Sequence, residues 1–188
     1  MQAVELTTAR LQLSGWAPSD APELAAICAD PEVMRYFPAP LTRARSDELL
    51  ERLKAGFERR GYDFWAVREV DSPALLGLVG LTSVPVSMPV DAPVEVGWRL
   101  ARSAWGRGIA TEAASASLDY GFDELGLTEI VAYTSQINER SRRVMSRLGM
   151  QRDAADDFDN PSIAAADPLR PHVVYRTGAD AWRARRGR

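Results

Sequence analysis

Two glycines separated by one residue, Gly106 and Gly108, lie between a predicted strand and a predicted helix. Residues 94–100 alternate in polarity and are rich in β-branched and aromatic side chains, which predicts the strand. The small residues between Ala113 and Leu118 predict a closely packed helix. A glycine turn at a helix start leaves backbone N–H groups without partners at the positive end of the helix dipole, which favours an anion such as phosphate.

Two common phosphate-binding sequences do not match this turn. A P-loop requires Gly-x-x-x-x-Gly-Lys-Ser/Thr, and the single lysine of the chain, Lys54, lies far from the turn. A dinucleotide-binding turn requires Gly-x-Gly-x-x-Gly, and Thr111 stands where the third glycine would be. A glycine turn that only begins a helix is the remaining alternative, so the flanking residues decide between the interpretations.

Length and composition narrow the class of protein. A chain of 188 residues with 46% hydrophobic side chains suits one domain, residues 1–188. A net charge of −3 argues against a nucleic-acid partner, and no run of about 18 apolar residues predicts a membrane span. One cysteine and one histidine are too few for a disulfide or a zinc site, so we expect no metal. Without a secretory signal at Met1, we expect a cytoplasmic protein.

Strands and helices are expected to alternate around the glycine turn. The arginine-rich residues 180–188 are expected to form a solvated tail. The pattern as a whole predicts a mixed α/β fold, with helices on both faces of a mixed sheet. The expected strands are 5–13, 64–67, 75–81, 94–100, 129–135 and 172–177, with helices at 22–29, 46–60 and after 108, a short helix capped by Asn138, a proline-rich loop at 83–93 and an acidic irregular segment at 153–168.

Two blocks of this sequence resemble the acyl-CoA site of the GCN5-related N-acetyltransferases (GNAT). More narrowly, the chain is similar to the branch that includes the ribosomal-protein N-terminal alanine and serine acetyltransferases, which residues 30–36 and 172–175 also match. One departure is Ser103, where the superfamily has Gln or Arg. The blocks are Glu95-Val96-Gly97-Trp98-Arg99-Leu100 with Trp105-Gly106-Arg107-Gly108-Ile109-Ala110-Thr111-Glu112-Ala113, and Asn138-Glu139-Arg140-Ser141-Arg142-Arg143-Val144-Met145-Ser146-Arg147-Leu148-Gly149-Met150.

The resemblance implies both a fold and a cofactor site. The fold would be a mixed sheet of roughly seven strands, in which the fourth and fifth strands splay apart to admit acetyl-CoA. The pantetheine arm would follow the strand, the pyrophosphate would lie on the N–H groups of the turn, and Asn138 would reach the cofactor. The residues expected to bind acetyl-CoA are Trp98, Arg99, Leu100, Trp105, Gly106, Arg107, Gly108, Ile109, Ala110, Thr111 and Asn138.

Acetyl transfer needs a neutral amine, a proton acceptor for it and a donor for the departing thiolate. Glu95 is our candidate base, acting directly or through water, and the alternative is an outward-facing strand glutamate. Ser141 is the candidate donor to sulfur, as the resemblance implies, and Tyr133 and Tyr175 are weaker candidates. No histidine lies near Cys28 in the sequence, so we expect direct transfer in a ternary complex rather than an acyl-enzyme.

The acceptor is not determined by the sequence. An α-amino group has a pKa of about 7.7–8.0 and a lysine amine about 10.4, so a protein N-terminus is the easier nucleophile at neutral pH. A small-molecule amine and an aminoglycoside-like drug stay open. The acidic segment 153–159 would attract a cationic amine, although a solvated loop is the favoured interpretation. The rival hypothesis is a catalytically silent acyl-CoA-binding sensor, and both a monomer and a homodimer are compatible with the sequence.

Overall fold

The computed structural model describes residues 4–187, which divide into two compact units. The first unit comprises Met1–Thr82 and Gly97–Ser117, and the second comprises Ser83–Val96 and Leu118–Arg188. Parallel and antiparallel strand pairs occur together with helices, which confirms the predicted mixed α/β fold. The described residues form nine strands rather than about seven, and three of the nine are only two residues long. A single domain over residues 1–188 stays a prediction.

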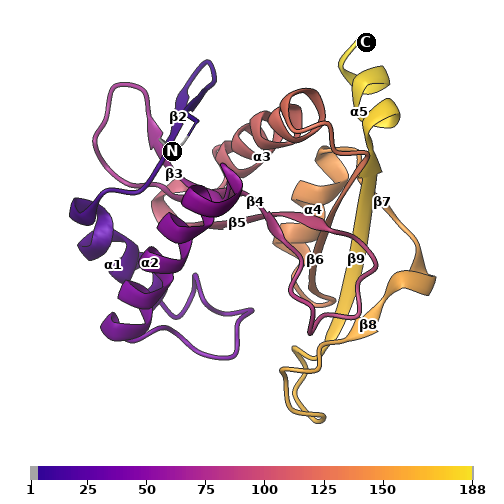
Figure 1. Cartoon of the computed structure of the whole chain (residues 1–188). Coiled ribbons are helices and arrows are strands. Elements are labelled where there is room, and N and C mark those ends of the chain that lie inside the picture. Colours follow the sequence, from indigo (N-terminus) through magenta and orange to yellow (C-terminus); the bar gives the residue numbers. More distant parts are fainter. Residues whose placement is uncertain (1–3, 188) are drawn as a thin grey trace. The chain divides into compact units, whose positions relative to one another are not determined.

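The first unit combines an antiparallel sheet with two helices. Its strands pair in the order β1-β2-β3-β4. Helices α1 and α2 lie side by side (Figure 1) and bury apolar side chains such as Leu24 and Leu50. The rings of Phe57 and Trp65 meet edge to face at 5.5 Å between centroids. The elements are β1 (Leu6–Thr7), β2 (Leu11–Ser14), α1 (Ala21–Ala29), α2 (Arg43–Arg60), β3 (Phe64–Glu69) and β4 (Gly77–Ser83).

The first predicted strand, 5–13, is a hairpin of β1 and β2 instead. The hydroxyl oxygen of Thr8 accepts hydrogen bonds from the backbone N–H groups of Leu11, at 2.9 Å, and Arg10, at 3.3 Å. These bonds close a turn, because a threonine hydroxyl can replace a backbone partner.

Helix α2 begins three residues before the predicted start. Thr42 caps it, because its side chain accepts a hydrogen bond from the N–H of Arg45.

The second unit is built around two long antiparallel strands, β6 (Glu129–Ser135) and β9 (Pro171–Gly178). They pair along all seven residues of β6 and lie side by side in Figure 1. The other edge of β6 pairs in parallel with β5 (Val94–Leu100), which begins in this unit and continues in the first, with Glu95 opposite Val131. Two short strands, β7 (Gln151–Arg152) and β8 (Phe158–Asp159), pair with β9, and helix α4 spans Glu139–Arg147.

The acidic segment 153–159 is held by ion pairs rather than being a solvated loop. Hydrogen bonds from Arg152 lower the pKa of the Asp157 carboxyl, which outweighs the opposite effect of burial. The segment therefore offers little unpaired negative charge to a cationic substrate. Its carboxylates pair as follows: Asp156 with Arg176, Asp157 with Arg152 and Asp159 with Arg170.

The C-terminal residues expected to form a solvated tail are a helix, α5 (Ala179–Arg186). Trp182 is only 4% exposed, its indole N–H donates to Asp119 Oδ1 at 2.7 Å, and its ring packs against Phe122 at 6.4 Å between centroids. Arg183 pairs with Asp123, and Arg186 pairs with both Asp119 and Asp123. The prediction of a tail was wrong for residues 179–186, and Arg188 lies outside the described residues. None of the described helices combines the length and apolar composition that a membrane crossing needs.

Replacing Trp182 by Ala should lower the free energy of unfolding by about 3–5 kcal/mol, because the change leaves a cavity and removes the hydrogen bond to Asp119. Denaturant unfolding of the purified variant measures this. Val86→Ala is the control, since Val86 is fully exposed and should change nothing. Equal unfolding midpoints for the wild type and Trp182→Ala would mean that α5 does not contribute to the core.

Candidate functional site

The strand, glycine turn and helix predicted around Gly106 are all present, and the turn lies in the first unit. Strand β5 ends at Leu100, and its carbonyl accepts the indole N–H of Trp105 at 3.0 Å. Helix α3 (Ile109–Asp119) follows two glycines in the left-handed region, Gly106 at φ 72° and Gly108 at φ 79°. Both backbone angles are ones that side chains with a Cβ rarely adopt, so the turn depends on glycine here.

The start of α3 presents a group of unpartnered N–H donors. In the part of the chain that the structure describes, the N–H groups of residues 108–111 have no acceptor, and the first helical bond is donated by Glu112 to the Gly108 carbonyl at 3.0 Å. These donors have the geometry expected for an anion site at a helix start. That an acetyl-CoA pyrophosphate occupies it stays a prediction.

A charged clamp that the sequence did not reveal fixes this turn. Glu112 Oε1 accepts from the Thr8 hydroxyl at 2.6 Å, and Arg10 Nε donates to Glu112 Oε2 at 2.7 Å. Arg10 also donates from Nη1 to the Arg107 carbonyl at 3.2 Å, which ties the turn directly to the β1–β2 hairpin. Burial by itself would raise the pKa of Glu112, but hydrogen bonds from Thr8 and Arg10 and the Arg10 charge lower it below its ordinary value.

Arg107, expected to contact the cofactor, pairs with Glu69 on β3. The side chains of Arg107 and Glu69 are 41% and 36% exposed. Exposed pairs contribute little to stability, so a phosphate could take the place of the carboxylate at low cost. The structure thus leaves Arg107 beside the turn, and its contact with acetyl-CoA stays a prediction.

The predicted base, Glu95, has a specific partner on the next strand. Glu95 is half-buried on β5 opposite Val131, and Tyr133 lies two residues further along β6 on the same face. The Tyr133 hydroxyl donates a hydrogen bond to the Glu95 carboxylate. Burial, together with the charge and hydrogen bond of Glu95, raises the pKa of Tyr133 far above its ordinary value. Tyr133 therefore stays protonated and serves as a donor.

Asn138 and Ser141 form the N-terminal cap of α4. The N–H of Ser141 donates to Asn138 Oδ1 at 3.2 Å, while Asn138 Nδ2 donates to Ser141 Oγ at 3.0 Å and to Thr134 Oγ1 at 2.9 Å. Both amide hydrogens of Asn138 are thereby used, which confirms the predicted cap. A cofactor contact would have to use Asn138 Oδ1 or the backbone, and it stays a prediction.

The other residues considered for chemistry are in structural positions. Tyr175 is 7% exposed on β9, opposite Ala132, and Cys28 is fully buried on α1. Burial lowers the pKa of the single histidine, His172, whose Nδ1 lies 3.0 Å from the Arg170 carbonyl oxygen. Within residues 4–187, no group of three or more His, Cys, Asp or Glu side chains is arranged to hold a metal.

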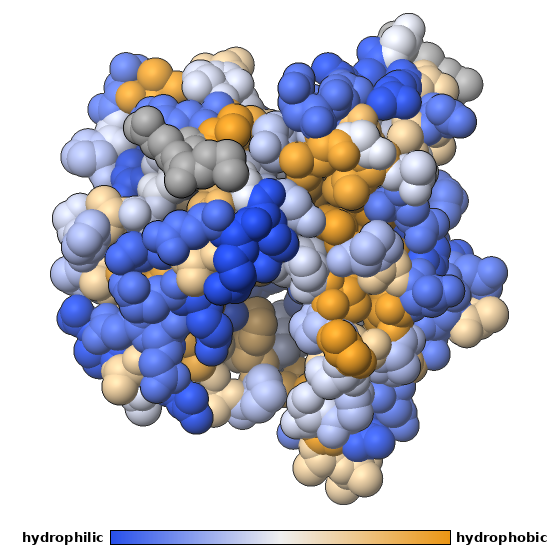
Figure 2. All heavy atoms as spheres, in the orientation of Figure 1, coloured by the Kyte–Doolittle hydropathy of each residue, from blue (hydrophilic) through white to orange (hydrophobic). Residues whose placement is uncertain are grey.

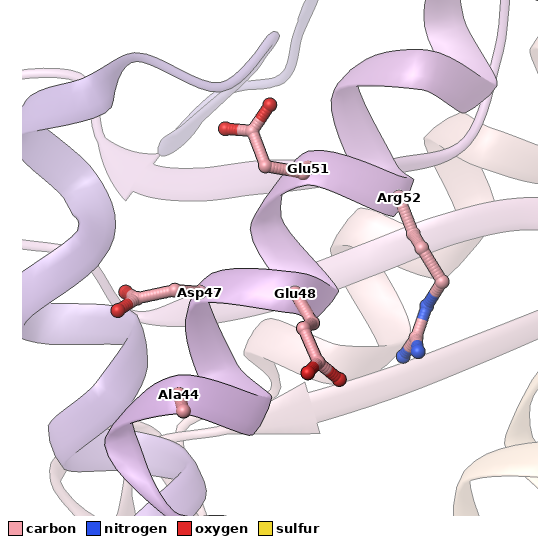
Figure 3. A pocket seen from close by; sticks show the side chains of 5 residues that line it. All are labelled: Ala44, Asp47, Glu48, Glu51 and Arg52. Atoms are coloured by element: carbon pink, nitrogen blue, oxygen red, sulfur yellow. The ribbon is translucent and has the colours of Figure 1, made fainter.

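A hollow of about 720 Å³ along α2 is not a competing site. Its lining side chains are charged, and Figure 3 shows Asp47 and Glu51 pointing away from Glu48 and Arg52 rather than toward one point. The three carboxylates pair with neighbours on the same helix, and Figure 2 shows hydrophilic side chains over α2. We interpret the hollow as part of a solvated helix face.

The chain is similar to acetyltransferases over most of its length. The family model of the acetyltransferase (GNAT) domain matches residues 10–151. The FsC-acetyl coenzyme A-N(2)-transacetylase of Aspergillus fumigatus is 32% identical over 154 residues, 77% of this chain and 64% of that protein. An acetyltransferase from Agrobacterium tumefaciens is 27% identical with a TM-score of 0.76, covering 94% of this chain and 95% of that one. A GNAT-family acetyltransferase from Bacillus anthracis has the same fold, with a TM-score of 0.78 at 22% identity, covering 94% of this chain and 99% of that one.

The lowered pKa of Glu112 predicts how stability depends on pH. The folded state favours the carboxylate, so this contribution is complete above the ordinary glutamate pKa and is lost as the pH falls through the lower, folded value. Glu112→Gln should cost about 1–2 kcal/mol at pH 7, a value reduced because the Arg10 side chain is 49% exposed. The difference from the wild type should shrink below pH 4.

Urea unfolding of both proteins between pH 3 and pH 7 measures this difference. Glu139→Gln is the matched control, because Glu139 forms a surface pair with Arg143 and its side chain is 73% exposed. Glu139→Gln should change the free energy of unfolding only slightly at every pH. A Glu112→Gln difference that stays constant with pH would contradict the clamp.

Proposed function

Because the chain belongs to the GNAT acetyltransferase family, we propose that it transfers the acetyl group of acetyl-CoA to a primary amine by direct attack, with Glu95 as the base. As a member of this family, the chain is an acetyl-CoA-dependent acetyltransferase. The acceptor, the base and the direct route are our proposals. The name of the Aspergillus relative, an N(2)-transacetylase, supports nitrogen as the acceptor atom.

Acetyl-CoA binding at the glycine turn is supported by the unpartnered N–H groups of residues 108–111. Diphosphate oxygens are acceptors that such donors bind well, and Gly106 and Gly108 keep the approach free of side chains. The added Cβ at Gly106 would meet no atom within 4 Å, so there is open space at the turn. Trp98, Arg99 and Leu100 on β5 would run beside the pantetheine arm, as the resemblance implies.

The observation that carries the assignment of the base is the hydrogen bond from Tyr133 to Glu95. This bond orients the carboxylate and favours its charged form, which is the form that accepts a proton. In the reaction, the amine nitrogen forms a bond to the thioester carbonyl carbon and Glu95 accepts the proton that the nitrogen loses. The carbon–sulfur bond then breaks and the sulfur leaves as a thiolate.

Ser141 is our proposed donor to that thiolate. Ser141 Oγ accepts a hydrogen bond from Asn138 Nδ2, so this contact does not use the hydroxyl hydrogen. A direct route needs no enzyme nucleophile, and the one cysteine, Cys28, is fully buried against Arg99 in the first unit. This arrangement supports transfer in a ternary complex.

Glu95→Gln should lower turnover by about 10²–10⁴-fold, the usual effect of losing a positioned base. Affinity for acetyl-CoA, measured as an increase in melting temperature, should hardly change because glutamine keeps the size of the side chain. Tyr133→Phe keeps the carboxylate but removes its donor, so the acid limb of the kcat/KM profile should move to higher pH.

The control is Glu124→Gln, at an exposed glutamate outside the site, which should leave turnover and binding unchanged. A fully active Glu95→Gln variant would mean that another group is the base. Wild-type protein that binds acetyl-CoA but acetylates no member of a broad amine panel would instead favour a silent acyl-CoA-binding module.

For the acceptor, we expect an α-amino group to be acetylated faster at neutral pH than a lysine amine, because more of it is unprotonated. Peptides that differ only in whether the free amine is terminal or on lysine test this expectation through the release of free thiol. The rate with the terminal amine should level off near pH 8. A rate that rises tenfold per pH unit above pH 9 would contradict an α-amine acceptor.

A further inference from the structure

Arg99 on β5 lies in an environment that is unusual for a cation. It is half-buried, its guanidinium carbon lies 4.4 Å from the centroid of the Phe37 ring, and its Nη1 donates to the sulfur of Cys28 at 3.1 Å. Phe37 belongs to the segment between α1 and α2, and Cys28 to α1. All three residues are in the first unit.

This guanidinium lacks the partner that a half-buried cation usually has. Within residues 4–187, no carboxylate pairs with Arg99, and its one hydrogen bond goes to sulfur, a weak acceptor. Its Nε is buried and has no acceptor among the described residues. Leaving such donors unsatisfied costs free energy, and buried charges are normally paired.

Arg68 shows the usual arrangement in the same unit. It is buried to a similar degree, and it pairs with the buried carboxylate of Asp20 and donates to Ser14 as well. Arg99 has instead an aromatic ring against one face of its guanidinium, which restrains the group without neutralising it. Such a preorganised guanidinium can still present its planar N–H fork to a carboxylate.

Phe37 also points to contact with a ligand. Its ring is 37% exposed, which makes it one of the few large exposed hydrophobic side chains of the described chain. The ring and the guanidinium together offer an apolar surface beside a positive charge. That combination suits a substrate with a carboxylate next to an apolar group.

We propose that Arg99, held by Phe37 and Cys28, binds a carboxylate of the substrate. The proposal rests on the proposed function, since it names a feature of the acyl acceptor: an amine that also carries a carboxylate. Arg99 belongs to the same strand, β5, as Glu95, our proposed base. Three of the four carboxylates in the segment 153–159 are paired with arginines, so this segment has little unpaired charge to attract a polycation.

The first test compares acceptors that differ only in charge. Peptide pairs with a free or an amidated C-terminus, and pairs with aspartate or asparagine beside the amine, are assayed by thiol release. In each pair, the wild type should have the higher kcat/KM for the peptide that carries the carboxylate. Arg99→Gln should lower kcat/KM about 10- to 100-fold for that peptide and leave it unchanged for the neutral peptide. Arg99→Lys should restore part of the preference, because lysine keeps the charge but not the fork.

Arg102→Gln is the matched control, because Arg102 is three residues away with a side chain 59% exposed beside Asp30, and it should leave the preference unchanged. An acyl group is the other source of a carboxylate, so succinyl-CoA is assayed in parallel with acetyl-CoA. A preference for succinyl-CoA that depends on Arg99, with no acceptor preference, would overturn the assignment to the acceptor. Equal losses for both members of each peptide pair would overturn carboxylate binding altogether.

A second measurement does not depend on turnover. The buried Nε–H of Arg99 should give a ¹H–¹⁵N signal that exchanges slowly with water, identified by its absence in Arg99→Lys. In CoA-saturated protein, titration with the N-acetylated peptide acid should shift this signal, and the N-acetylated peptide amide should not. A shift without any acetyl transfer would uphold this site while contradicting the proposed function. No shift in an active enzyme would overturn the site alone.

Discussion

The interaction between Arg10 and Glu112 fixes the glycine turn of the first unit, where we propose that acetyl-CoA binds. A turn with two left-handed glycines has little conformational restraint of its own, because glycine permits many backbone conformations. The clamp supplies that restraint from outside the turn: Glu112 joins the first turn of α3 to Thr8 and Arg10, and Arg10 also holds the Arg107 carbonyl. The N–H donors of residues 108–111 are thereby kept in one arrangement without being consumed.

The second unit holds in a similar way the two residues that we propose as base and as proton donor. Tyr133 donates a hydrogen bond to Glu95, and Asn138 donates one to Ser141. Tyr133 is itself supported by packing against a cluster of Val90, Val131 and Val174 and by an edge-to-face contact with Phe158 at 5.8 Å. Burial there keeps Tyr133 protonated, which makes it a dependable donor.

Features encoded by neighbouring residues could be predicted from the sequence, and features that need distant partners could not. The strand before Gly106, the helix after Gly108 and the Asn138 cap each follow from a local pattern. The clamp joins residues about a hundred positions apart, and no local pattern announces it. Tyr133 was considered only as a donor to sulfur, because the register that brings it to Glu95 depends on the pairing of β5 and β6.

The same reason explains the errors at the two ends of the chain. A threonine hydroxyl divided the first strand, since Thr8 closes a turn that hydrophobic alternation does not reveal. The last residues were read as a solvated tail because their arginines dominate the composition, yet a single buried tryptophan, Trp182, determines their structure. A run of like charges is a poor predictor of a solvated segment when residues of opposite charge, here Asp119 and Asp123, lie on another helical segment and pair with it.

The sequence separation between β6 and β9 has a consequence for biosynthesis. Strand β9 pairs with the whole of β6 and also with β7 and β8, yet residues 171–178 are synthesised after all three. Until β9 emerges from the ribosome, β6 has one complete edge of unpaired backbone groups, the kind of edge that invites pairing with another chain. Folding of the second unit must therefore wait for β9, and nascent chains that have not yet reached β9 would be its most aggregation-prone form.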